Sequence, residues 1–391
     1  MLTYKEDYFV KPEKIFTKRG TMIVLNVYLD NFYAFKDFQM NLTYPKKIVD
    51  SYIQDEHLKD HPNFRYKKVN IIMGANASGK TTFGYMLMSI FNFISEKNHS
   101  FITGIVNDRS RTASFMIDLI CESDILYRIA CTIPPKPEGK YDTGDVKLEI
   151  RNENIRIKDS YESCIKRLEA ASYSPCENYL QELEKMESIF WLFEYPRDTN
   201  RTLYFRSKDV KFPYVLENIL KALDPSVQKV ERSQDVENAF VIRLRDRAII
   251  LQNGSPFETE LLSSGTKAGV EIAMVVSSLL QGFNTFYYCD EKFSYIHSDI
   301  EKAVLSLMID SIRPNEQLFF TTHNTDILDM NLPKHTFTFL RKTLEGDEHL
   351  ISCVSASSLL KRSSDSLKNA VENDMFSTSP MVDLIYAIGG L

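Results

Sequence analysis

The 391-residue sequence lacks long apolar segments, and no uninterrupted run reaches the roughly 18 residues that a membrane-spanning helix needs. Its first twenty residues alternate charged and aromatic side chains and contain no apolar stretch typical of a secretory signal. No internal repeat is present. We therefore expect a cytoplasmic protein with no membrane partner.

Cysteine pairs with metal-binding spacing are also missing. No Cys-x-x-Cys motif occurs, so neither a disulfide framework nor a zinc site is indicated. We expect reduced core residues at all six cysteine positions, which are Cys121, Cys131, Cys164, Cys176, Cys289 and Cys353.

The sequence has no excess of positive charge. Lys and Arg number 47 against 53 Asp and Glu, and the net charge of −6 disfavours a surface covered in phosphate-binding lysines. A local basic surface is compatible with this total, so a nucleic-acid partner is possible but not indicated. The candidates are Arg243, Arg245 and Arg247, predicted to share one strand face, and Arg65, Lys67 and Lys68 before the next buried strand. The solvated side of a sheet is the more ordinary interpretation.

Alternating patterns of apolar residues predict the fold class. Hydrophobic residues at 43% and charged residues at 26% are typical of a globular protein. Residues 22–42 alternate as paired strands do, and residues 69–73 form a buried strand that ends on glycine. Helical spacing follows over 81–94, and again over 298–312 between short apolar runs at 285–289 and 317–321. This alternation predicts an α/β fold with a mixed, mostly parallel sheet.

We expect four segments along the chain. Residues 20–150 form the first half of an α/β domain, which we call the head. Residues 151–235 form a helical insertion or lid, because 161–223 is rich in helix formers broken by prolines. Residues 236–345 complete the head, and 346–391 form a C-terminal tail.

A glycine-rich loop lies between the strand at 69–73 and the helix from 81. Residues 74–81 read GANASGKT and match the Walker A pattern G-x-x-x-x-G-K-[ST]. Backbone N–H groups of such a loop surround phosphates, with Lys80 on the β- and γ-phosphates and the Thr81 hydroxyl on Mg²⁺. The predicted nucleotide-binding residues are Gly74, Ala75, Asn76, Ala77, Ser78, Gly79, Lys80, Thr81 and Thr82.

Two carboxylates follow the apolar run at 285–289. Asp290 and Glu291 would lie at the C-terminal edge of the sheet, where ligands bind in open α/β folds. We expect Asp290 to hold Mg²⁺ and Glu291 to act as general base on the attacking water. Without the upstream loop, two acidic residues at a strand end would ordinarily be solvated.

A second small-residue loop, Leu262 to Lys267, opens a helix about two dozen residues before Asp290. Such a helix N-terminus can bind an anion, and Ser263, Ser264 and Gly265 are the candidates. The alternative is an ordinary N-cap.

Two histidines complete the pattern. His323 ends the strand at 317–321 and can hydrogen-bond a γ-phosphate or its attacking water. His297 follows Glu291 closely and could be either a residue of the site or a packing residue.

With these motifs in order, the chain resembles the ABC-like ATPases, which include SMC, RecF-type and overcoming-lysogenisation-defect proteins. The segments SSGTK, DEKFSYIH, TTHNTDIL and LDNFYAF are also similar to bacterial proteins commonly called AAA family ATPases. The resemblance implies a P-loop ABC-ATPase-like head in which the loop at Ser263 to Gly265 contacts the γ-phosphate held by another copy. Ser264 and Thr266 depart from the usual LSGGQ loop, and no Q-loop glutamine is assigned.

The resemblance implies an ATPase switch that uses ATP and Mg²⁺, works as a homo-oligomer with a functional dimer of heads, and serves a separate effector in anti-phage defence. No nuclease pattern follows His323, which favours a separately encoded effector. Two alternatives remain open, namely a DNA-repair or DNA-clamping ATPase of RecF or SMC type, and a module that holds ATP but hardly hydrolyses it.

Overall fold

The computed structural model describes residues 21–48, 51–121, 124–186, 188–194, 211–236, 239–252, 255–256, 263–282, 284–293, 296–345, 348–362, 365–378, 386 and 388. Within these ranges no helix is both long and apolar enough to cross a membrane.

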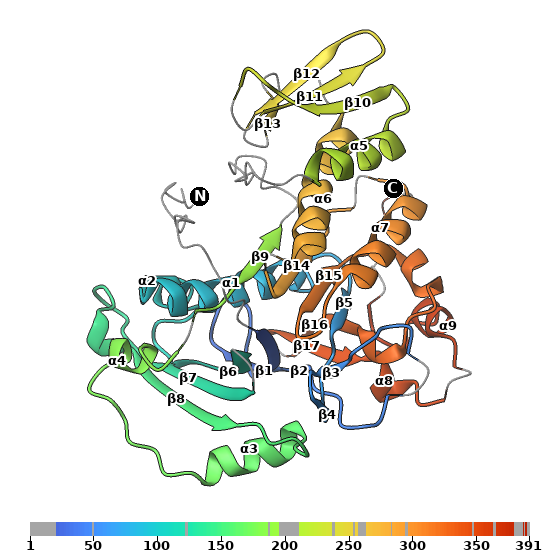
Figure 1. The fold of residues 1–391 in the computed structure, drawn as a ribbon. Helices are drawn as coiled ribbons and strands as arrows, with labels where there is room; N and C mark the ends of the chain where they lie inside the picture. Colours follow the sequence, from blue (N-terminus) through green and yellow to red (C-terminus); the bar gives the residue numbers. More distant parts are fainter. Residues whose placement is uncertain are drawn as a thin grey trace.

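A six-stranded sheet forms the centre of the molecule (Figure 1). Five of its strands are mutually parallel and the sixth, at one edge, is antiparallel to its neighbour, so the prediction of a mixed, mostly parallel sheet is confirmed. In spatial order from one edge the strands are β9 (Trp191–Glu194), β14 (Phe286–Asp290), β15 (Gln317–Thr321), β5 (Val69–Met73), β16 (Phe337–Glu345) and β17 (Glu348–Ser355).

Both faces of this sheet are covered, which explains why its central strands are continuously apolar. Because side chains alternate along a strand, Tyr288 and Phe319 face one core while Tyr287 and Phe320 face the other. The first core contains α1 (Lys80–Glu96), and its predicted apolar face is buried as expected. The second core contains α6 (Ser264–Gln281) and α7 (Ser298–Ser311).

An antiparallel five-stranded sheet lies on the far side of α1 (Figure 1). The predicted pairing within residues 22–42 is confirmed by β1 and β2. In spatial order this sheet contains β2 (Phe38–Asn41), β1 (Met22–Asp30), β6 (Ala113–Cys121), β7 (Ile125–Ile133) and β8 (Lys147–Asn154). The short helix α2 (Ser100–Thr103) follows α1.

The side chain of Gln317 joins the two sheets. Its Oε1 accepts from Val24 N at 2.9 Å, and its Nε2 donates to Val24 O and Lys67 O, both at 3.0 Å. Val24 lies at the bulge of β1, where the ladder to β6 is interrupted. Fully buried Gln317 therefore hydrogen-bonds backbone groups of β1 and of Lys67 at once.

A third sheet lies at the end of α5 and α6, away from the five-stranded sheet (Figure 1). It is antiparallel and packs on α5 (Phe212–Leu223). Its strands are β10 (Val227–Arg232), β11 (Ala239–Leu244), β12 (Ala248–Gln252) and β13 (Ser255–Pro256).

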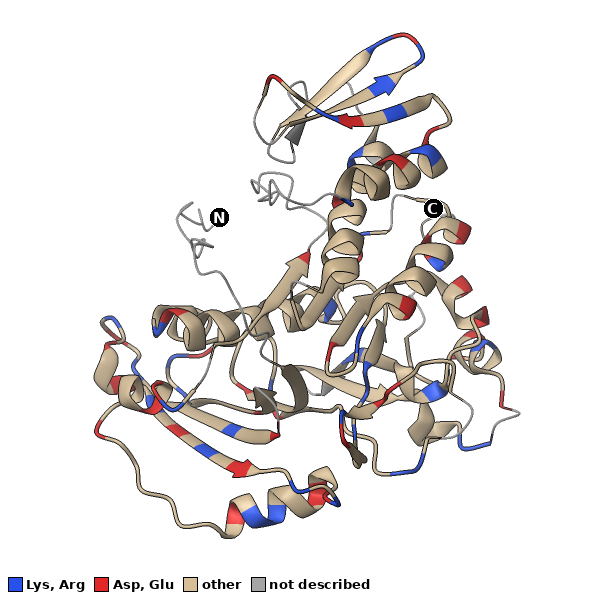
Figure 2. Ribbon diagram, viewed as in Figure 1, with Lys and Arg blue, Asp and Glu red and all other residues tan. Residues whose placement is uncertain are grey.

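The proposed basic surfaces are not formed as predicted. Arg243 lies on β11, but Arg245 and Arg247 lie in the turn after it, so the three do not share a strand face. Lys67 and Lys68 are buried, with exposed fractions of 4% and 2%. Lys67 donates to Ser355 Oγ, and burial lowers its pKa to about 8. Figure 2 shows basic and acidic residues interspersed over the ribbon rather than separated by sign.

Within the stretch 161–223, the helix predicted over residues 177–193 is wrong in its second half. Only α4 (Tyr179–Leu183) is helical, and Trp191–Glu194 forms the edge strand β9. Phe193 stacks on Tyr288 of β14 with ring centroids 5.4 Å apart. Strand pairing and aromatic packing thus override the local helical pattern. The helix expected near residue 161 is present as α3 (Tyr161–Ala170).

The remaining elements are short and peripheral. They are β3 (His57–Leu58), β4 (His61–Arg65), η1 (Thr143–Asp145), η3 (Thr325–Asp329), η4 (Lys334–Thr336), α8 (Ala356–Leu359) and α9 (Leu367–Glu372). The predicted boundary between 345 and 346 falls between β16 and β17, which pair with each other, and Glu348–Ser355 belong to the central sheet. The division of the chain into domains stays a prediction.

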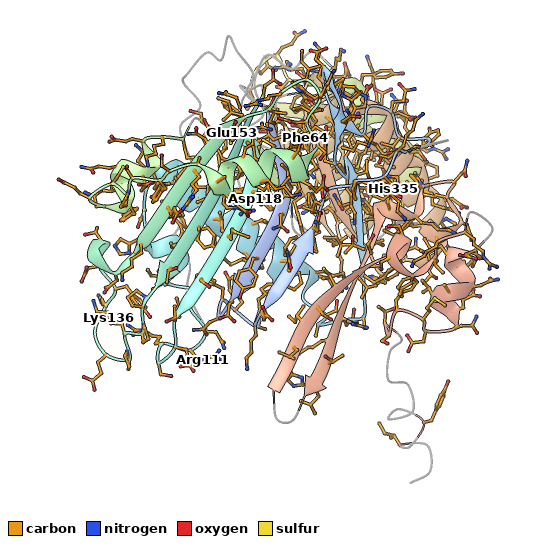
Figure 3. The ribbon with its side chains drawn as sticks, turned by 90° about the horizontal axis from the view of Figure 1, so that it is seen from below. Phe64, Arg111, Asp118, Lys136, Glu153 and His335 are labelled. Atoms are coloured by element: carbon orange, nitrogen blue, oxygen red, sulfur yellow. The ribbon has the colours of Figure 1, made fainter. Side chains whose placement is uncertain are left out.

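A buried carboxylate ties α3 to the outer face of the five-stranded sheet (Figure 3). Asp118 of β6 is fully buried and accepts from Arg128 Nε at 2.7 Å and Nη2 at 2.8 Å. The Tyr161 hydroxyl of α3 donates to it at 2.6 Å. Arg128 also donates to Glu169, whose side chain is 56% exposed.

We expect Asp118→Ala to lower the free energy of unfolding by about 3–5 kcal/mol, because it leaves the largely buried Arg128 without its bidentate partner. Glu169→Ala removes the exposed partner of the same arginine and should cost about 0–1 kcal/mol. Urea unfolding of both variants measures the difference. Equal costs would contradict this account of the cluster.

Candidate functional site

The loop from Gly74 to Gly79 connects β5 to α1 in the predicted way. Gly79 has a φ of 103°, which side chains other than hydrogen rarely allow. A Cβ on Gly74 would lie 2.3 Å from the carbonyl oxygen of Leu340, so this position requires glycine. The loop conformation is therefore fixed by its glycines.

The N-terminus of α1 points its first backbone N–H groups at this loop. Its N-cap is Gly79, which offers no side-chain cap, and no acidic residue occupies the first turn. A helix start of this kind favours an anion. Ser78 Oγ is buried in the same loop and has no hydrogen-bond partner, which leaves it available to a ligand.

Lys80 is buried at the start of α1, with an exposed fraction of 4%. Its Nζ donates to Gly74 O at 2.9 Å and Ala75 O at 3.2 Å, and lies 3.1 Å from Glu291 Oε1. The ammonium group therefore lies across the mouth of the loop and contacts the carboxylate from the neighbouring strand end.

Asp290 is the last residue of β14 and is fully buried. The hydroxyls of Thr81 and Thr321 donate to its two oxygens, each at 2.6 Å. Burial raises the pKa of this carboxyl group, and the two hydroxyl hydrogen bonds oppose the rise. A cation here would favour the charged form further.

Glu291 adopts a left-handed conformation with a φ of 43°, which is uncommon for a residue with a side chain. Its N–H donates to Thr321 Oγ1 at 3.0 Å and Thr321 O at 3.2 Å. The carboxylate is 24% exposed and lies 4.0 Å from His323 Nδ1 as well as beside Lys80. Backbone contacts with β15 thus hold Glu291 in a strained conformation that directs its side chain to the loop.

His323 follows β15, and its side chain is 54% exposed. It lines a cavity of about 240 Å³ together with Phe293 of the segment after Glu291. Buried Glu301 of α7 fixes the loop on both sides of the histidine, accepting from Thr322 Oγ1 at 2.9 Å and Asn324 Nδ2 at 2.6 Å. Burial raises the pKa of Glu301. The structure therefore places His323 Nδ1 4.0 Å from Glu291 Oε1.

The start of α6 carries Ser263, Ser264 and Gly265, the predicted anion-binding residues. Ser263 is the N-cap, with its Oγ accepting from Thr266 N at 3.1 Å, and Ser264 and Gly265 begin the helix. Among the described residues and side chains, no hydrogen bond or ion pair joins Ser263 or Gly265 to residues 74–82 of the same chain. Leu262 lies outside the described residues. His297 is exposed and caps α7 through Asp299 N, so it is not a packing residue.

Several residues of this site were missed by the sequence reasoning. Thr321 bonds Asp290, and the buried Tyr288 hydroxyl donates to Lys80 O at 2.7 Å. Lys292 is buried and pairs with Glu271 of α6 at 2.7 Å. Thr321 could have been found from its place two residues before His323. The Lys292 contact has no local pattern, because it joins residues of different elements.

The residues present fit a nucleotide and a magnesium ion. Gly74, the orphaned Ser78 hydroxyl and the uncapped helix start suit phosphate oxygens. Thr81 and Asp290 offer hard oxygen ligands side by side. In the described part of the chain no three acidic, histidine or cysteine residues cluster as a complete metal cage, and Mg²⁺ is commonly held by one or two protein oxygens plus phosphates.

The class of fold is therefore mixed α/β, with a glycine loop and two carboxylates at the C-terminal edge of a mostly parallel sheet. Known structures that it resembles are SMC heads and RecF, which are ABC-like ATPases. No protein-family model matches the chain, and no curated protein matches it in sequence.

Three of these solved structures illustrate the likeness. An SMC head bound to the C-winged helix domain of ScpA is 14% identical, with a TM-score of 0.49 over 87% of this chain and 99% of that one. The Smc head with an extended coiled coil, from Pyrococcus furiosus, gives 13% and 0.47 over 87% and 98%. The recombination mediator RecF gives 11% and 0.43 over 86% and 99%. Such distant likenesses establish no activity, so the function depends on the site's own geometry.

Proposed function

We propose that the chain is an ABC-type ATPase that binds ATP with Mg²⁺ and hydrolyses it to ADP and phosphate. The observation that supports this most directly is the convergence of Lys80, Asp290 and Glu291, from α1 and the end of β14, at one edge of the sheet. α1 and β14 are far apart in sequence, so the cluster is a product of the fold.

Each residue has a distinct part in the proposed reaction. Lys80 exchanges its carbonyl partners in the loop for β- and γ-phosphate oxygens, which separates it from Glu291. The released carboxylate then orients the attacking water and accepts its proton. His323, 4.0 Å from that carboxylate, hydrogen-bonds the γ-phosphate side of the site. Held by Thr81 and Asp290, Mg²⁺ would neutralise charge on the phosphates.

The second part of the proposal is a site shared between two copies. Ser263, Ser264 and Gly265 form a helix start without acidic residues in the first turn. In the described part of the chain, Ser263 and Gly265 make no hydrogen bond or ion pair with residues 74–82 of their own chain. A helix start of this kind suits the γ-phosphate bound by a partner. ATP would then close a homodimer, and hydrolysis would open it.

The biological role that we propose is a cytoplasmic switch for a separate effector protein in anti-phage defence. It is supported by the motif resemblance of the segments around Ser263, Asp290 and His323 to proteins of such modules. Degradation of nucleic acid by the purified protein alone, lost in Lys80→Met, would contradict a separate effector.

Removal of magnesium tests the chemistry. We expect EDTA to abolish ATP turnover, and Thr81→Ala to lower it by about 10-fold or more at low Mg²⁺, because one ligand oxygen beside Asp290 is lost. The matched control is Thr132→Ala, which removes an exposed threonine hydroxyl on β7 of the five-stranded sheet. A magnesium titration of phosphate release measures both variants. Turnover that persists in EDTA would overturn the assigned metal chemistry.

A further inference from the structure

Three consecutive residues at the end of β14 contact three different parts of the molecule. Asp290 accepts from Thr81 of α1, and Glu291 pairs with Lys80 at the mouth of the loop. Lys292 points the other way, to Glu271 of α6, with 2.7 Å between Nζ and Oε2. Glu291, beside the loop, is therefore followed directly in the chain by a residue anchored on α6.

The Lys292 side chain is almost completely buried, with an exposed fraction of 2%. Glu271 is 15% exposed, and a second carboxylate, Glu194 at the end of β9, lies 3.9 Å from the ammonium group. β9 pairs directly with β14 through Glu194 and Cys289. The lysine thus lies between the edge strand of the central sheet and α6. Because a buried charge is costly unless it is paired, its position is tightly determined.

The anchored residue lies on the helix that begins at Ser263. Glu271 comes eight residues after Ser263, or about 12 Å along the axis at roughly 1.5 Å per residue. α6 is continuous from Ser264 to Gln281, so a displacement at Glu271 displaces its N-terminus as well. Gly269 lies between these points against Leu220 and Leu223 of α5, which holds this part of the helix close to its neighbour.

We propose that Lys292 is a positioning residue that couples the two halves of the composite site within one chain. When Glu291 changes its contacts at the nucleotide of its own chain, Lys292 changes the position of Glu271 and with it that of the Ser263–Gly265 helix start. This helix start acts on the nucleotide of the other copy. This inference depends on the proposed two-copy ATPase. It adds a route by which one bound ATP prepares the chain to complete the second site.

Merely stabilising the fold is the competing role for a buried ion pair. The two roles differ in a measurable way, because a stabilising pair leaves the ATP concentration needed for dimerisation unchanged once the protein is folded. The test uses the wild-type chain as parent and a non-hydrolysable ATP analogue throughout, so that Glu291 keeps its ion pair with Lys80 and hydrolysis cannot confuse the result. The added changes are Lys292→Met, Glu271→Gln and the double change Lys292→Met with Glu271→Met, which removes both charges of the pair and favours folding.

The matched control is Lys136→Met. Lys136 also lies between two carboxylates, Asp142 and Asp145, but it is partly exposed at the far end of the five-stranded sheet (Figure 3). Dimer formation is followed by light scattering over a titration with the non-hydrolysable analogue. ATP binding to the single chain is measured with a fluorescent ATP analogue at protein concentrations too low for dimerisation.

We expect all three Lys292 and Glu271 variants to dimerise only at a nucleotide concentration about 10-fold or more above that of the parent. This lies within the usual 5–150-fold range of coupling between sites. Their single-chain affinity should change by less than about threefold, and Lys136→Met should match the parent. Dimerisation of the folded double variant at the parent's nucleotide concentration would overturn the inference and leave the ATPase intact. A parent that binds ATP but never dimerises would overturn the two-copy site and this coupling together.

Discussion

Glu291→Gln should lower the steady-state rate of ATP hydrolysis by about 10²–10⁴-fold, the usual contribution of a general base. The amide keeps the size of the side chain but cannot accept the proton of the attacking water. It also loses the ion pair with Lys80, so ATP binding should stay within a few-fold of wild type or become tighter. Single-turnover phosphate release and equilibrium ATP binding measure the two effects separately.

The control for this change is Glu169→Gln, an exposed carboxylate on α3 far from the loop. It should leave turnover unchanged. Equal rates for wild type and Glu291→Gln would remove Glu291 from its role as general base.

Lys80→Met should abolish measurable ATP binding at micromolar nucleotide. Two hydrogen bonds from a charged donor to phosphate oxygens contribute about 3–6 kcal/mol in total, which corresponds to roughly a 10²-fold or larger loss of affinity. Methionine retains most of the apolar stem in this buried position, so the fold should be preserved. Calorimetric titration with ATP and Mg²⁺ checks the affinity, and thermal unfolding checks the fold.

Lys97→Met provides a matched comparison, because Lys97 caps the opposite end of the same helix and is exposed. It should bind ATP as wild type does. If Lys80→Met bound ATP with unchanged affinity, the glycine loop would not be the nucleotide site.

The candidate site could be predicted from sequence to the extent that it follows from local rules. A strand, a glycine loop and a helix are contiguous, so the geometry around Gly79 and Lys80 is encoded within some twenty residues. Asp290 ends one strand and His323 follows its parallel neighbour, and the C-terminal ends of such strands meet at one edge. Their proximity was therefore predictable without knowledge of the rest of the fold.

What could not be predicted depends on pairing between distant segments. Trp191–Glu194 is a strand only because β14 provides a partner and Tyr288 a stacking surface. Lys67 and Lys68 appear in sequence as part of a basic cluster, yet the packing of neighbouring strands buries them. The Lys292–Glu271 pair likewise forms between residues that no local pattern relates. In each case tertiary contacts outweigh the local preference.

The sequence motifs and the geometry of the site support the same proposed mechanism from different directions. The motifs provide the order of the functional groups along the chain, and the structure provides contacts such as Thr81 to Asp290 that the motifs do not specify. Whether the helix start at Ser263 acts on another copy is the step on which the switch depends.

Light scattering of Glu291→Gln with ATP and Mg²⁺ tests this step most directly. With ATP we expect a mass of about twice the 45.2 kDa of one chain. With ADP we expect the mass of a single chain. Adding Gly265→Asp, which places a carboxylate where the partner's γ-phosphate would bind, should keep the protein at the mass of one chain. A single-chain mass at saturating ATP, or a dimer that tolerates Gly265→Asp, would contradict a site shared between two copies.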